Sequence, residues 1–410
     1  MKKVAIVTSG YLPVPDVLGG AVEGLVSCLA RENGAKGLLD LTVYSMDDPR
    51  ARRAAAPVGS STHFEFVDTP GYIKAADKFV YWFAKSILRK KKNMSWAHVL
   101  QRVHYLRRVA ELVACDEADL LVLENHPTQC MVLDRCGNAD RYRGKTMLHL
   151  HNEVTNDFGY HAFLEQIDSV ICVSSFIARS FAGFIGWPQD DRRLRVLRNC
   201  AIDPFFTSGR SLEVRNSTRK RLGIAPEAFV VLFSGRLTEE KGASQLLDAF
   251  AKANVPGSHL LIAGAYFFKD KATSPFEEEL KRKASALGDR VTFTGFVDHP
   301  EMANLYAACD IVCNPSVWDD PALLANIEGL AAGKPVVSTY SGGVPEYVDA
   351  SCGVLVERDE HMVDKLAQAI SSLAGDASLL EKLSDGACKA ASDLDVKSYY
   401  SRFCEIISNV

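Results

Sequence analysis

Two carboxylates, Asp320 and Glu328, stand eight positions apart around a run of small and apolar residues. Proline suits the first turn of a helix, and Pro321 directly follows the first carboxylate. We therefore expect a helix over residues 322–332, with Asp320 at an N-cap position and both carboxylates near one face. The first N–H groups of such a helix lack internal partners, so its start is a candidate anion site. A buried helix with one solvated glutamate is the plainer interpretation.

Two basic residues, Arg236 and Lys241, follow a buried strand that we expect at residues 229–233. Gly235 precedes the arginine and Gly242 follows the lysine. Arginine offers a planar fork of donors and lysine a compact charge, so the pair could hold a diphosphate from two sides. The alternative is a surface turn with ordinary solvated charges.

Polar residues also gather behind the strand expected at residues 146–151, where His149 and His151 stand two positions apart. Side chains at this spacing leave the same face of a strand. Ligands of an open parallel sheet bind beyond the carboxyl ends of its strands, so the pair is a candidate for contact with a ligand. A single histidine here would more often be a satisfied core side chain. A metal site formed with His126 also stays open, although no convincing carboxylate accompanies the three.

Gly19 and Gly20 lie between an apolar strand and a helix expected at residues 21–31. Backbone without a Cβ can approach a ligand closely, so this loop could cradle a phosphate or a sugar. A plain turn would use the same two glycines. The dinucleotide pattern G-x-G-x-x-G is absent from this loop.

Short apolar runs alternate with helical patterns along the whole chain, which predicts two doubly wound α/β domains that face each other across a cleft. The strands are expected at residues 4–7, 41–45, 64–67, 119–123, 146–151, 170–173, 229–233, 260–264, 291–295, 311–316, 336–339 and 354–356. We assign residues 1–206 to an N-terminal domain on the acceptor side and residues 207–395 to a nucleotide-sugar-binding domain, with a polar linker at 207–218. The tail, 396–410, spaces its apolar residues as a helix does and is expected to cross back onto the first domain.

The composition excludes several classes of protein. A chain of 410 residues suggests two domains, and a net charge of −4 argues against nucleic-acid binding by bulk electrostatics. The eleven cysteines are dispersed without a C-x-x-C pair, which indicates reduced, buried thiols in a cytoplasmic protein. No apolar run reaches the length needed to span a bilayer.

Residues 74–108 differ from the rest of the chain because they hold ten basic residues and one acid, Asp77. Aromatic residues are interleaved with the charges: Phe79, Tyr81, Trp82, Phe83, Trp96 and Tyr105. This combination is typical of a helix that lies on an anionic membrane surface. The alternative is a pair of helices with solvated charges and with aromatics packed on the domain.

The segment around the two carboxylates resembles the signature of the retaining glycosyltransferases of family 4, which have the GT-B fold. The runs GLAAGKPVVS (329–338) and GGVPE (342–346) match this signature closely. Asp320 takes the place of the first of two family glutamates, and Glu328 takes the place of the second. Leu323 stands where the family often has glycine. The pairs Gly-Arg and Lys-Gly at 235–242 also share the family's spacing.

The resemblance implies a donor site in the second domain. Arg236 and Lys241 would stabilise charge on the leaving diphosphate. Glu328 would hold the ribose hydroxyls, and Asp320 would accept hydrogen bonds from the donor sugar. The resemblance also implies that the backbone N–H groups near Leu324 and Ala325 reach the distal phosphate. The backbone of Phe296 and Val297 would meet the base.

For the first domain, the resemblance implies that Gly19 and Gly20 face the donor and the acceptor. Related enzymes carry a histidine at the end of the strand predicted at 146–151, facing the transferred sugar. His151, nearer the strand end, is therefore expected to orient the sugar or the acceptor, and His149 is the second candidate.

These features predict a retaining glycosyltransferase of hexosyltransferase type. The donor would be a nucleotide-diphosphate sugar, with uridine favoured by family frequency, and the acceptor a saccharide or lipid-linked saccharide in surface polysaccharide synthesis. The enzyme would lie in the cytoplasm, with residues 74–108 as a candidate contact to the inner face of the plasma membrane. No D-x-D pair lies near the proposed site, so no metal or other cofactor is expected. Two alternatives are a sugar-nucleotide epimerase of the same fold and a non-catalytic sugar-binding partner of a synthesis complex.

Overall fold

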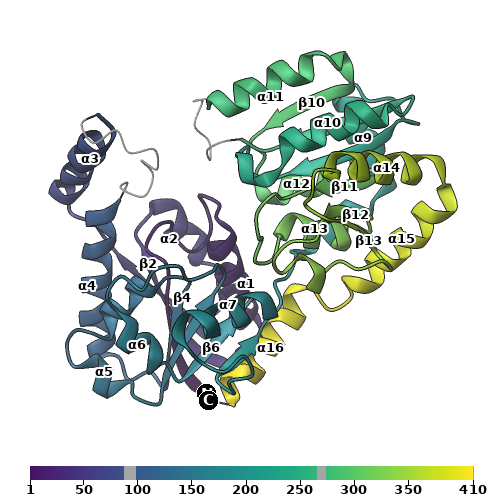
Figure 1. Cartoon of the computed structure of the whole chain (residues 1–410). Helices are drawn as coiled ribbons and strands as arrows, with labels where there is room; N and C mark the ends of the chain where they lie inside the picture. Colours follow the sequence, from purple (N-terminus) through teal and green to yellow (C-terminus); the bar gives the residue numbers. More distant parts are fainter. Residues whose placement is uncertain (87–97, 266–273, 410) are drawn as a thin grey trace. The chain divides into compact units, whose positions relative to one another are not determined.

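The computed structural model describes residues 1–86, 98–265 and 274–409. Internal contacts divide the chain into two compact units. The first unit comprises Met1–Val173, Ile177–Leu197 and Tyr400–Val410, and the second comprises Ser174–Phe176 and Arg198–Tyr399. In Figure 1 most of the first unit is purple to blue, and most of the second is green to yellow.

The first unit is built on a seven-stranded parallel sheet with the order β3-β2-β1-β4-β5-β6-β7. Its strands are β1 Lys2–Val7, β2 Leu39–Met46, β3 Thr62–Val67, β4 Leu120–Glu124, β5 Thr146–Leu150, β6 Ser169–Cys172 and β7 Leu194–Val196. Every residue of β4 and β5 is buried, as the apolar runs predicted for a sheet covered on both faces. Because β1, β4 and β5 are neighbours, the loops that follow them emerge side by side at one edge of the sheet.

Helices flank this sheet in the way expected of an alternating α/β chain (Figure 1). They are α1 Ala21–Lys36, α2 Pro49–Ala55, α3 Gly71–Ser86, α4 Val99–Cys115, η2 Pro127–Val132, α5 Asn138–Arg141, α6 His161–Glu165 and α7 Ser175–Ile185. The helix predicted at residues 21–31 continues to Lys36, where Gly37 closes it in the left-handed conformation.

The second unit is built on a six-stranded parallel sheet with the order β10-β9-β8-β11-β12-β13. Its strands are β8 Phe229–Ser234, β9 Ser258–Ala263, β10 Val291–Gly295, β11 Ile311–Asn314, β12 Val336–Thr339 and β13 Gly353–Val356. Successive side chains of β8 alternate between two apolar clusters. Val230 and Leu232 belong to one cluster, whereas Val231 and Phe233 belong to the other. The sheet therefore has a separate apolar core on each face.

The remaining helices belong mostly to the second unit. They are α8 Asp203–Phe206, η3 Ser208–Arg210, α9 Leu212–Arg221, η4 Glu239–Lys241, α10 Ala243–Ala253, α11 Pro275–Ser285, η5 Gly288–Arg290, α12 His299–Ala308, α13 Leu324–Ala331, η6 Val344–Glu346, α14 Met362–Gly375, α15 Ala377–Ala390 and α16 Val396–Ser408. The polar linker predicted at 207–218 is wrong, because α9 begins inside it. The Ser211 side chain caps this helix, and the buried Arg219 binds Asp310 at 2.8 Å.

The last helix, α16, contributes its final part to the first unit. The hydroxyl of Tyr400 donates a hydrogen bond to Asn33 Oδ1 at 2.5 Å, and Lys2 Nζ donates to the carbonyl of Ile407 at 2.8 Å. The helix predicted from the apolar spacing of the tail is therefore present, and it has hydrogen-bond partners near the start of the chain.

The cysteines are free thiols, as predicted, and seven of them are buried. Cys115 and Cys136 are exposed, so the expectation of buried thiols fails at these two positions. Among the helices that the structure describes, none combines the length and the apolar character required to traverse a bilayer.

Candidate functional site

A cation and a carboxylate predicted for one site meet in the second unit. Lys241 Nζ lies 2.8 Å from Asp320 Oδ2, and both side chains are largely buried. The same carboxylate oxygen accepts hydrogen bonds from Ser316 Oγ at 3.0 Å and from the Trp318 indole N–H at 3.2 Å. The lysine ammonium also lies 5.3 Å from the centre of the Trp318 ring. Asp320 is thus a charge held by three donors.

The loops after β8 and β11 position this pair. The N–H of Val317, on the loop after β11, donates to the carbonyl of Glu240, on the loop after β8, at 2.9 Å. A third loop contributes Gly342, where a Cβ would lie only 2.3 Å from the carbonyl oxygen of Asp320. Close approach of two backbones therefore explains why this turn needs glycine.

Arg236 belongs to the same loop after β8 as Lys241. Its guanidinium is more than half exposed and forms a long ion pair with Glu240 at 3.8 Å. Gly235, at the end of the strand, donates its N–H to the carbonyl of Ala263 at 3.0 Å. The arginine fork is therefore free to turn toward an anion, whereas Lys241 is held by Asp320.

The helix expected at residues 322–332 is shorter than predicted. α13 begins at Leu324, and its N-cap residue is Leu323 rather than Asp320. The interpretation of Asp320 and Glu328 as two positions on one helix is therefore wrong. Asp320 instead belongs to the preceding loop, because its backbone is fixed by the Gly342–Gly343 turn. The N–H groups of Leu324 and Ala325 belong to the first turn of the helix, where no carbonyl within the helix can accept them.

Glu328, on α13, is buried, and both of its carboxylate oxygens have partners. His299 Nε2 lies 2.6 Å from Oε1, and the hydroxyl of Tyr306 lies 2.8 Å from Oε2. Burial and the neighbouring carboxylate raise the pKa of Tyr306, so this hydroxyl remains a donor. The side chain of His299 is 42% exposed, so this partner can rotate away more easily than the buried tyrosine.

The residues proposed to meet the base follow β10. Phe296 and Val297 are both half-buried, and Val297 packs against the apolar cluster that contains Tyr306 and Ile327. This contact places the backbone after β10 beside the helix that carries Glu328. The second unit therefore pairs Lys241 with Asp320 on two loops, whereas Glu328 lies on the following helix and is bound by His299 and Tyr306.

In the first unit, Gly19 and Gly20 lie at the start of α1, both with positive φ. A Cβ on Gly20 would lie 2.3 Å from Glu23 Oε2, so the glycine leaves room for a buried carboxylate. Ser9 Oγ donates to the other oxygen of Glu23 at 2.8 Å. Burial raises the pKa of Glu23, and the nearby charge of Glu124 raises it further.

His149 and His151 share a single buried carboxylate. His149 Nδ1 lies 3.2 Å from Glu124 Oε1, and His151 Nε2 lies 3.1 Å from Oε2. The two imidazole rings are 4.1 Å apart. Glu124 and His149 are register partners on β4 and β5, so the parallel pairing of the strands creates the contact.

Burial and mutual contacts shift the pKa values of Glu124 and His151 in this cluster. Burial raises the pKa of Glu124, but the two imidazoles outweigh this effect and lower the pKa below its usual range. Burial, with a smaller contribution from His149, lowers the pKa of His151 to about 4, although Glu124 opposes this shift. A neutral His151 that donates from Nε2 to Glu124 keeps Nδ1 as an acceptor, and this buried atom has no hydrogen-bond partner. His149 Nε2 is also buried without a hydrogen-bond partner.

The same three residues form a possible metal centre. Two imidazole nitrogens and one carboxylate oxygen lie within 4.8 Å of one another, a donor set that suits zinc. His126, which the sequence left open as a ligand, is not part of this group. Hydrogen bonds account for both Glu124 contacts without an ion, so the geometry by itself requires no metal.

Sequence reasoning missed several polar partners in these sites. They are Glu23, Glu124, His299, Tyr306, Ser316 and Trp318. Glu124 could have been found, because it ends a strand whose neighbour in the sheet carries the two histidines. Tyr306 and His299 lie on a separate helix about twenty to thirty positions from Glu328, and no local pattern links them to it.

Comparison with known proteins gives a family for part of the chain. Residues 214–390 match the family described as Glycosyl transferases group 1. The chain is 25% identical to YtcC of Bacillus subtilis (strain 168), over 94% of this chain and 87% of that protein. It is 23% identical to the lipopolysaccharide 1,2-N-acetylglucosaminetransferase of Salmonella typhimurium, over 68% of this chain and 70% of that protein.

Solved structures share the fold along the whole length. Anabaena Alr3699/HepE in complex with UDP gives a TM-score of 0.74 with 21% identity, and the match covers 100% of both chains. WaaG, a glycosyltransferase involved in lipopolysaccharide biosynthesis, gives a TM-score of 0.66 with 17% identity over 99% of this chain and 100% of that chain. These likenesses confirm the predicted fold class.

Proposed function

The chain belongs to the retaining glycosyltransferases of family 4, and we propose that it transfers a hexose from a UDP-sugar to a saccharide or lipid-linked saccharide acceptor. The use of a nucleotide-sugar donor follows from the family. Uridine, the acceptor and a role in surface polysaccharide synthesis are parts of the proposal. HepE in complex with UDP and WaaG in lipopolysaccharide biosynthesis support them by analogy.

The observation that carries the proposal is the buried pair of Lys241 and Asp320, 2.8 Å apart on adjacent loops. As the bond between sugar and diphosphate breaks, negative charge develops on the leaving group. Lys241 and Arg236 stabilise this charge together with the first-turn amides of Leu324 and Ala325. Asp320 keeps the ammonium in place and accepts hydrogen bonds from the donor sugar.

Glu328 binds the ribose hydroxyls in this proposal. The carboxylate is already oriented by Tyr306, so it needs little reorganisation when a donor binds. His299 is the partner that the ribose replaces, because its side chain is the more exposed of the two. Phe296 and Val297 then present backbone to the base.

His151 orients the transferred sugar or the acceptor in the first unit, which we propose is the acceptor side. Its Nδ1 atom is a buried acceptor without a partner, and a sugar hydroxyl supplies the missing donor. Gly19 and Gly20 allow the backbone to approach the same ligand. No metal is needed for these roles, since Lys241 and Arg236 provide the positive charge.

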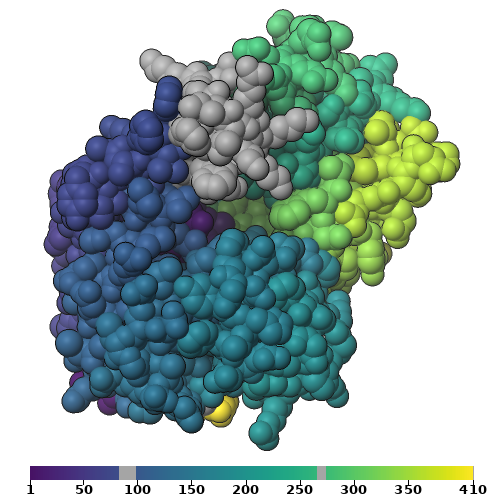
Figure 2. Space-filling model, turned by 60° about the vertical axis from the view of Figure 1, so that its left-hand side comes forward, coloured from purple at the N-terminus to yellow at the C-terminus, as the bar shows by residue number. Residues whose placement is uncertain are grey.

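We further propose that the enzyme binds the cytoplasmic face of an anionic membrane through α3. Tyr72, Phe79 and Trp82 are 74%, 63% and 53% exposed on this helix, and Lys74 and Lys78 are exposed beside them. Aromatic rings of this kind sit at headgroup depth, and lysines near an anionic surface add about 1 kcal/mol each. Figures 1 and 2 show α3 at the margin of the first unit.

Asp77 fixes the position of this helix. Its side chain is buried, and its carboxylate accepts hydrogen bonds from the N–H groups of Leu100 and Gln101 at 2.9 and 2.8 Å. The carboxylate thus joins α3 to the first turn of α4, while the aromatic side chains remain exposed. Residues 87–97, which include the basic run predicted to bind membrane at 89–92, lie outside the described residues.

A panel of nucleotide sugars tests the proposed activity. The enzyme is incubated with UDP-, GDP- and ADP-sugars, and free nucleotide and sugar products are measured. Release of UDP with retention of the anomeric configuration supports the proposal. A new nucleotide-sugar isomer would indicate an epimerase, and binding without turnover would indicate a non-catalytic partner.

A further inference from the structure

Arg102 is a buried arginine in the first unit, on the second turn of α4 and 7% exposed. Its Nε atom donates to the carbonyl of Ser9 at 2.8 Å, and Nη1 donates to the hydroxyl of Tyr11 at 3.1 Å. The guanidinium lies over the Tyr11 ring, 4.4 Å from its centre. The third nitrogen, Nη2, is buried and has no hydrogen-bond partner.

No carboxylate in the described part of the chain forms an ion pair with Arg102. Arg219, the comparable buried arginine of the second unit, binds Asp310 at 2.8 Å. A buried charge without a partner is costly, and an arginine keeps its charge under all ordinary conditions. Burial lowers the pKa of Arg102, which reflects the same missing counter-charge. An anion is therefore the group that would complete this environment.

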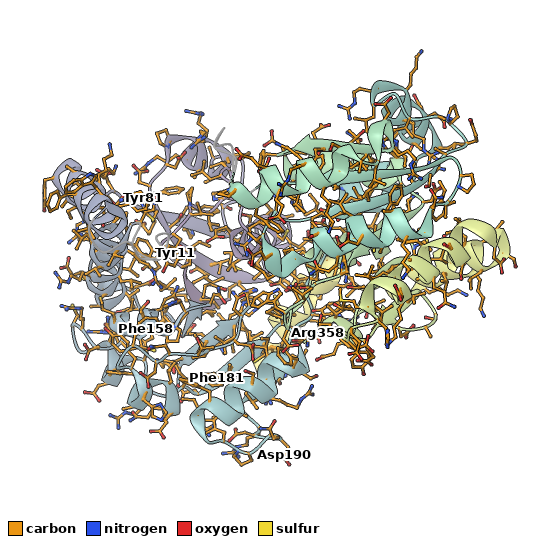
Figure 3. The ribbon with its side chains drawn as sticks, turned by 45° about the horizontal axis from the view of Figure 1, so that its top comes forward. Tyr11, Tyr81, Phe158, Phe181, Asp190 and Arg358 are labelled. Carbon is orange, nitrogen blue, oxygen red and sulfur yellow. The ribbon has the colours of Figure 1, made fainter. Side chains whose placement is uncertain are left out.

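The surroundings of Arg102 suit a phosphorylated sugar. Tyr11 is 46% exposed, and its ring is edge-on to the ring of His126. Phe158 is 53% exposed, and its ring centre lies 5.0 Å from that of His126. Figure 3 shows Tyr11 and Phe158 on the same part of the first unit. Aromatic rings present apolar faces to a ligand, and Tyr11 adds a hydroxyl.

His126 adds a neutral donor to this surface. Its Nδ1 atom accepts the N–H of Thr128 at 3.3 Å, so the ring proton lies on Nε2. Burial and, to a smaller extent, the charge of Arg102 lower the pKa of His126 to about 4. The imidazole is therefore neutral near pH 7, and Arg102 is the cation of the group.

We propose that Arg102, with Tyr11 and His126, binds a phosphate or diphosphate carried by the acceptor, and that Tyr11 and Phe158 stack on the adjoining sugar. This inference rests on the proposed transferase function and names the class of its acceptor as a phosphorylated saccharide. A free sugar phosphate and a lipid-linked sugar diphosphate share the required chemistry. The unpartnered Nη2 and the absence of an ion pair carry the argument.

Inorganic pyrophosphate probes the site directly. The enzyme is first saturated with UDP, so that the donor site is occupied, and pyrophosphate binding is then measured by calorimetry at constant ionic strength. Loss of charge-assisted hydrogen bonds in Arg102→Gln should weaken binding about tenfold to a hundredfold. Arg143→Gln, which removes an exposed arginine of the same unit, should leave the affinity unchanged.

Two further variants separate binding from folding. Tyr11→Phe removes one hydroxyl from a half-exposed ring and should weaken pyrophosphate binding severalfold without affecting UDP. Arg102→Lys keeps the charge but loses the fork, so its affinity should fall between those of the wild type and Arg102→Gln. Affinity for pyrophosphate equal to that of the wild type in both Arg102→Gln and Tyr11→Phe would overturn the proposal.

Turnover distinguishes the two sources of the phosphate. Arg102→Gln should raise the KM for a phosphorylated acceptor about tenfold or more, while hydrolysis of the UDP-sugar without acceptor stays at the wild-type rate. The free sugar phosphate is the substrate if it alone shows this effect, and the lipid-linked diphosphate is the substrate if that acceptor does. An unchanged KM for both would contradict the inference, whereas loss of UDP-sugar hydrolysis in the wild type would contradict the proposed function instead.

Discussion

The two units differ in whether the buried polar groups of their candidate sites have partners. In the second unit, Lys241 pairs with Asp320, and both oxygens of Glu328 have partners. In the first unit, Arg102 Nη2 and His151 Nδ1 are buried without partners. At Lys241, Asp320 and Glu328, on the proposed donor side, a ligand must therefore replace existing contacts. At Arg102 and His151, on the proposed acceptor side, a ligand would instead supply missing contacts, which favours selectivity for a matching acceptor over affinity for any sugar.

The largest expected effect comes from breaking the ion pair between Lys241 and Asp320. Lys241→Ala removes a charge-assisted contact of about 1.5–3 kcal/mol to the leaving diphosphate and leaves Asp320 without its cation. We expect kcat/KM for the UDP-sugar to fall about a hundredfold, with the fold retained by circular dichroism. Lys252→Ala, which breaks an exposed pair with Asp364, is the control and should keep full activity.

Replacing Arg236 by alanine tests the same site without disturbing a buried partner. Its side chain is exposed, so we expect an activity loss with no change in the melting temperature. Equal activity of wild type, Arg236→Ala and Lys241→Ala would exclude a phosphate role for this loop.

A second pair of variants sharpens the division of roles inside the donor site. Glu328→Ala should weaken UDP binding about tenfold, because a carboxylate that accepts ribose hydroxyls is lost. Asp320→Ala should reduce sugar transfer and leave UDP affinity nearly unchanged. Calorimetry with UDP checks both. An equal loss of UDP affinity in the two variants would show that the roles are not separate.

The histidine cluster predicts a pH dependence of stability. The pKa of His151 is lowered in the folded protein to about 4 from an ordinary value of 6.5, so unfolding takes up a proton between these values. Stability is therefore complete above about pH 6.5 and falls as the pH drops toward 4. His151→Gln should flatten this part of the melting curve measured against pH. His63→Gln changes an exposed histidine and should leave the dependence as in the wild type.

The smallest effect concerns the surface of α3. Phe79→Ser combined with Trp82→Ser should reduce sedimentation with anionic liposomes severalfold, because two exposed rings no longer enter the headgroup layer. Leu212→Ser, at an exposed position of α9, is the matched control. Binding should also fall with salt. Equal sedimentation with neutral and anionic vesicles would leave a soluble acceptor as the better interpretation.

Much of the fold could be read from local patterns. Runs such as Val4–Val7 and Phe229–Phe233 are apolar at every position, and a strand buried on both faces requires this composition. The alternation of these runs with helical segments predicts parallel sheets. The linker at 207–218 was misread because α9 is highly charged, and its stability comes from Arg219 and Asp310 rather than from an apolar stripe.

The sequence by itself determined which segments were predicted to carry the donor site. The spacing of Arg236 and Lys241 and the GGVPE turn are local features, and their residues belong to contiguous segments. Local sequence could not predict where the helix after Asp320 begins. The carbonyl of Asp320 accepts a hydrogen bond from the N–H of Gly343, which lies on a loop more than twenty positions away.

Only the tertiary structure decided how the buried polar groups pair. Glu124 meets His149 and His151 because β4 and β5 lie side by side in the sheet, and Glu328 meets Tyr306 because α12 packs near α13. Arg102 could not be recognised as an arginine without a counter-charge, since any of the acids of the chain could have been its partner. Pairing and burial depend on residues distant in sequence, and these two properties set the protonation and the free hydrogen-bonding capacity of each group.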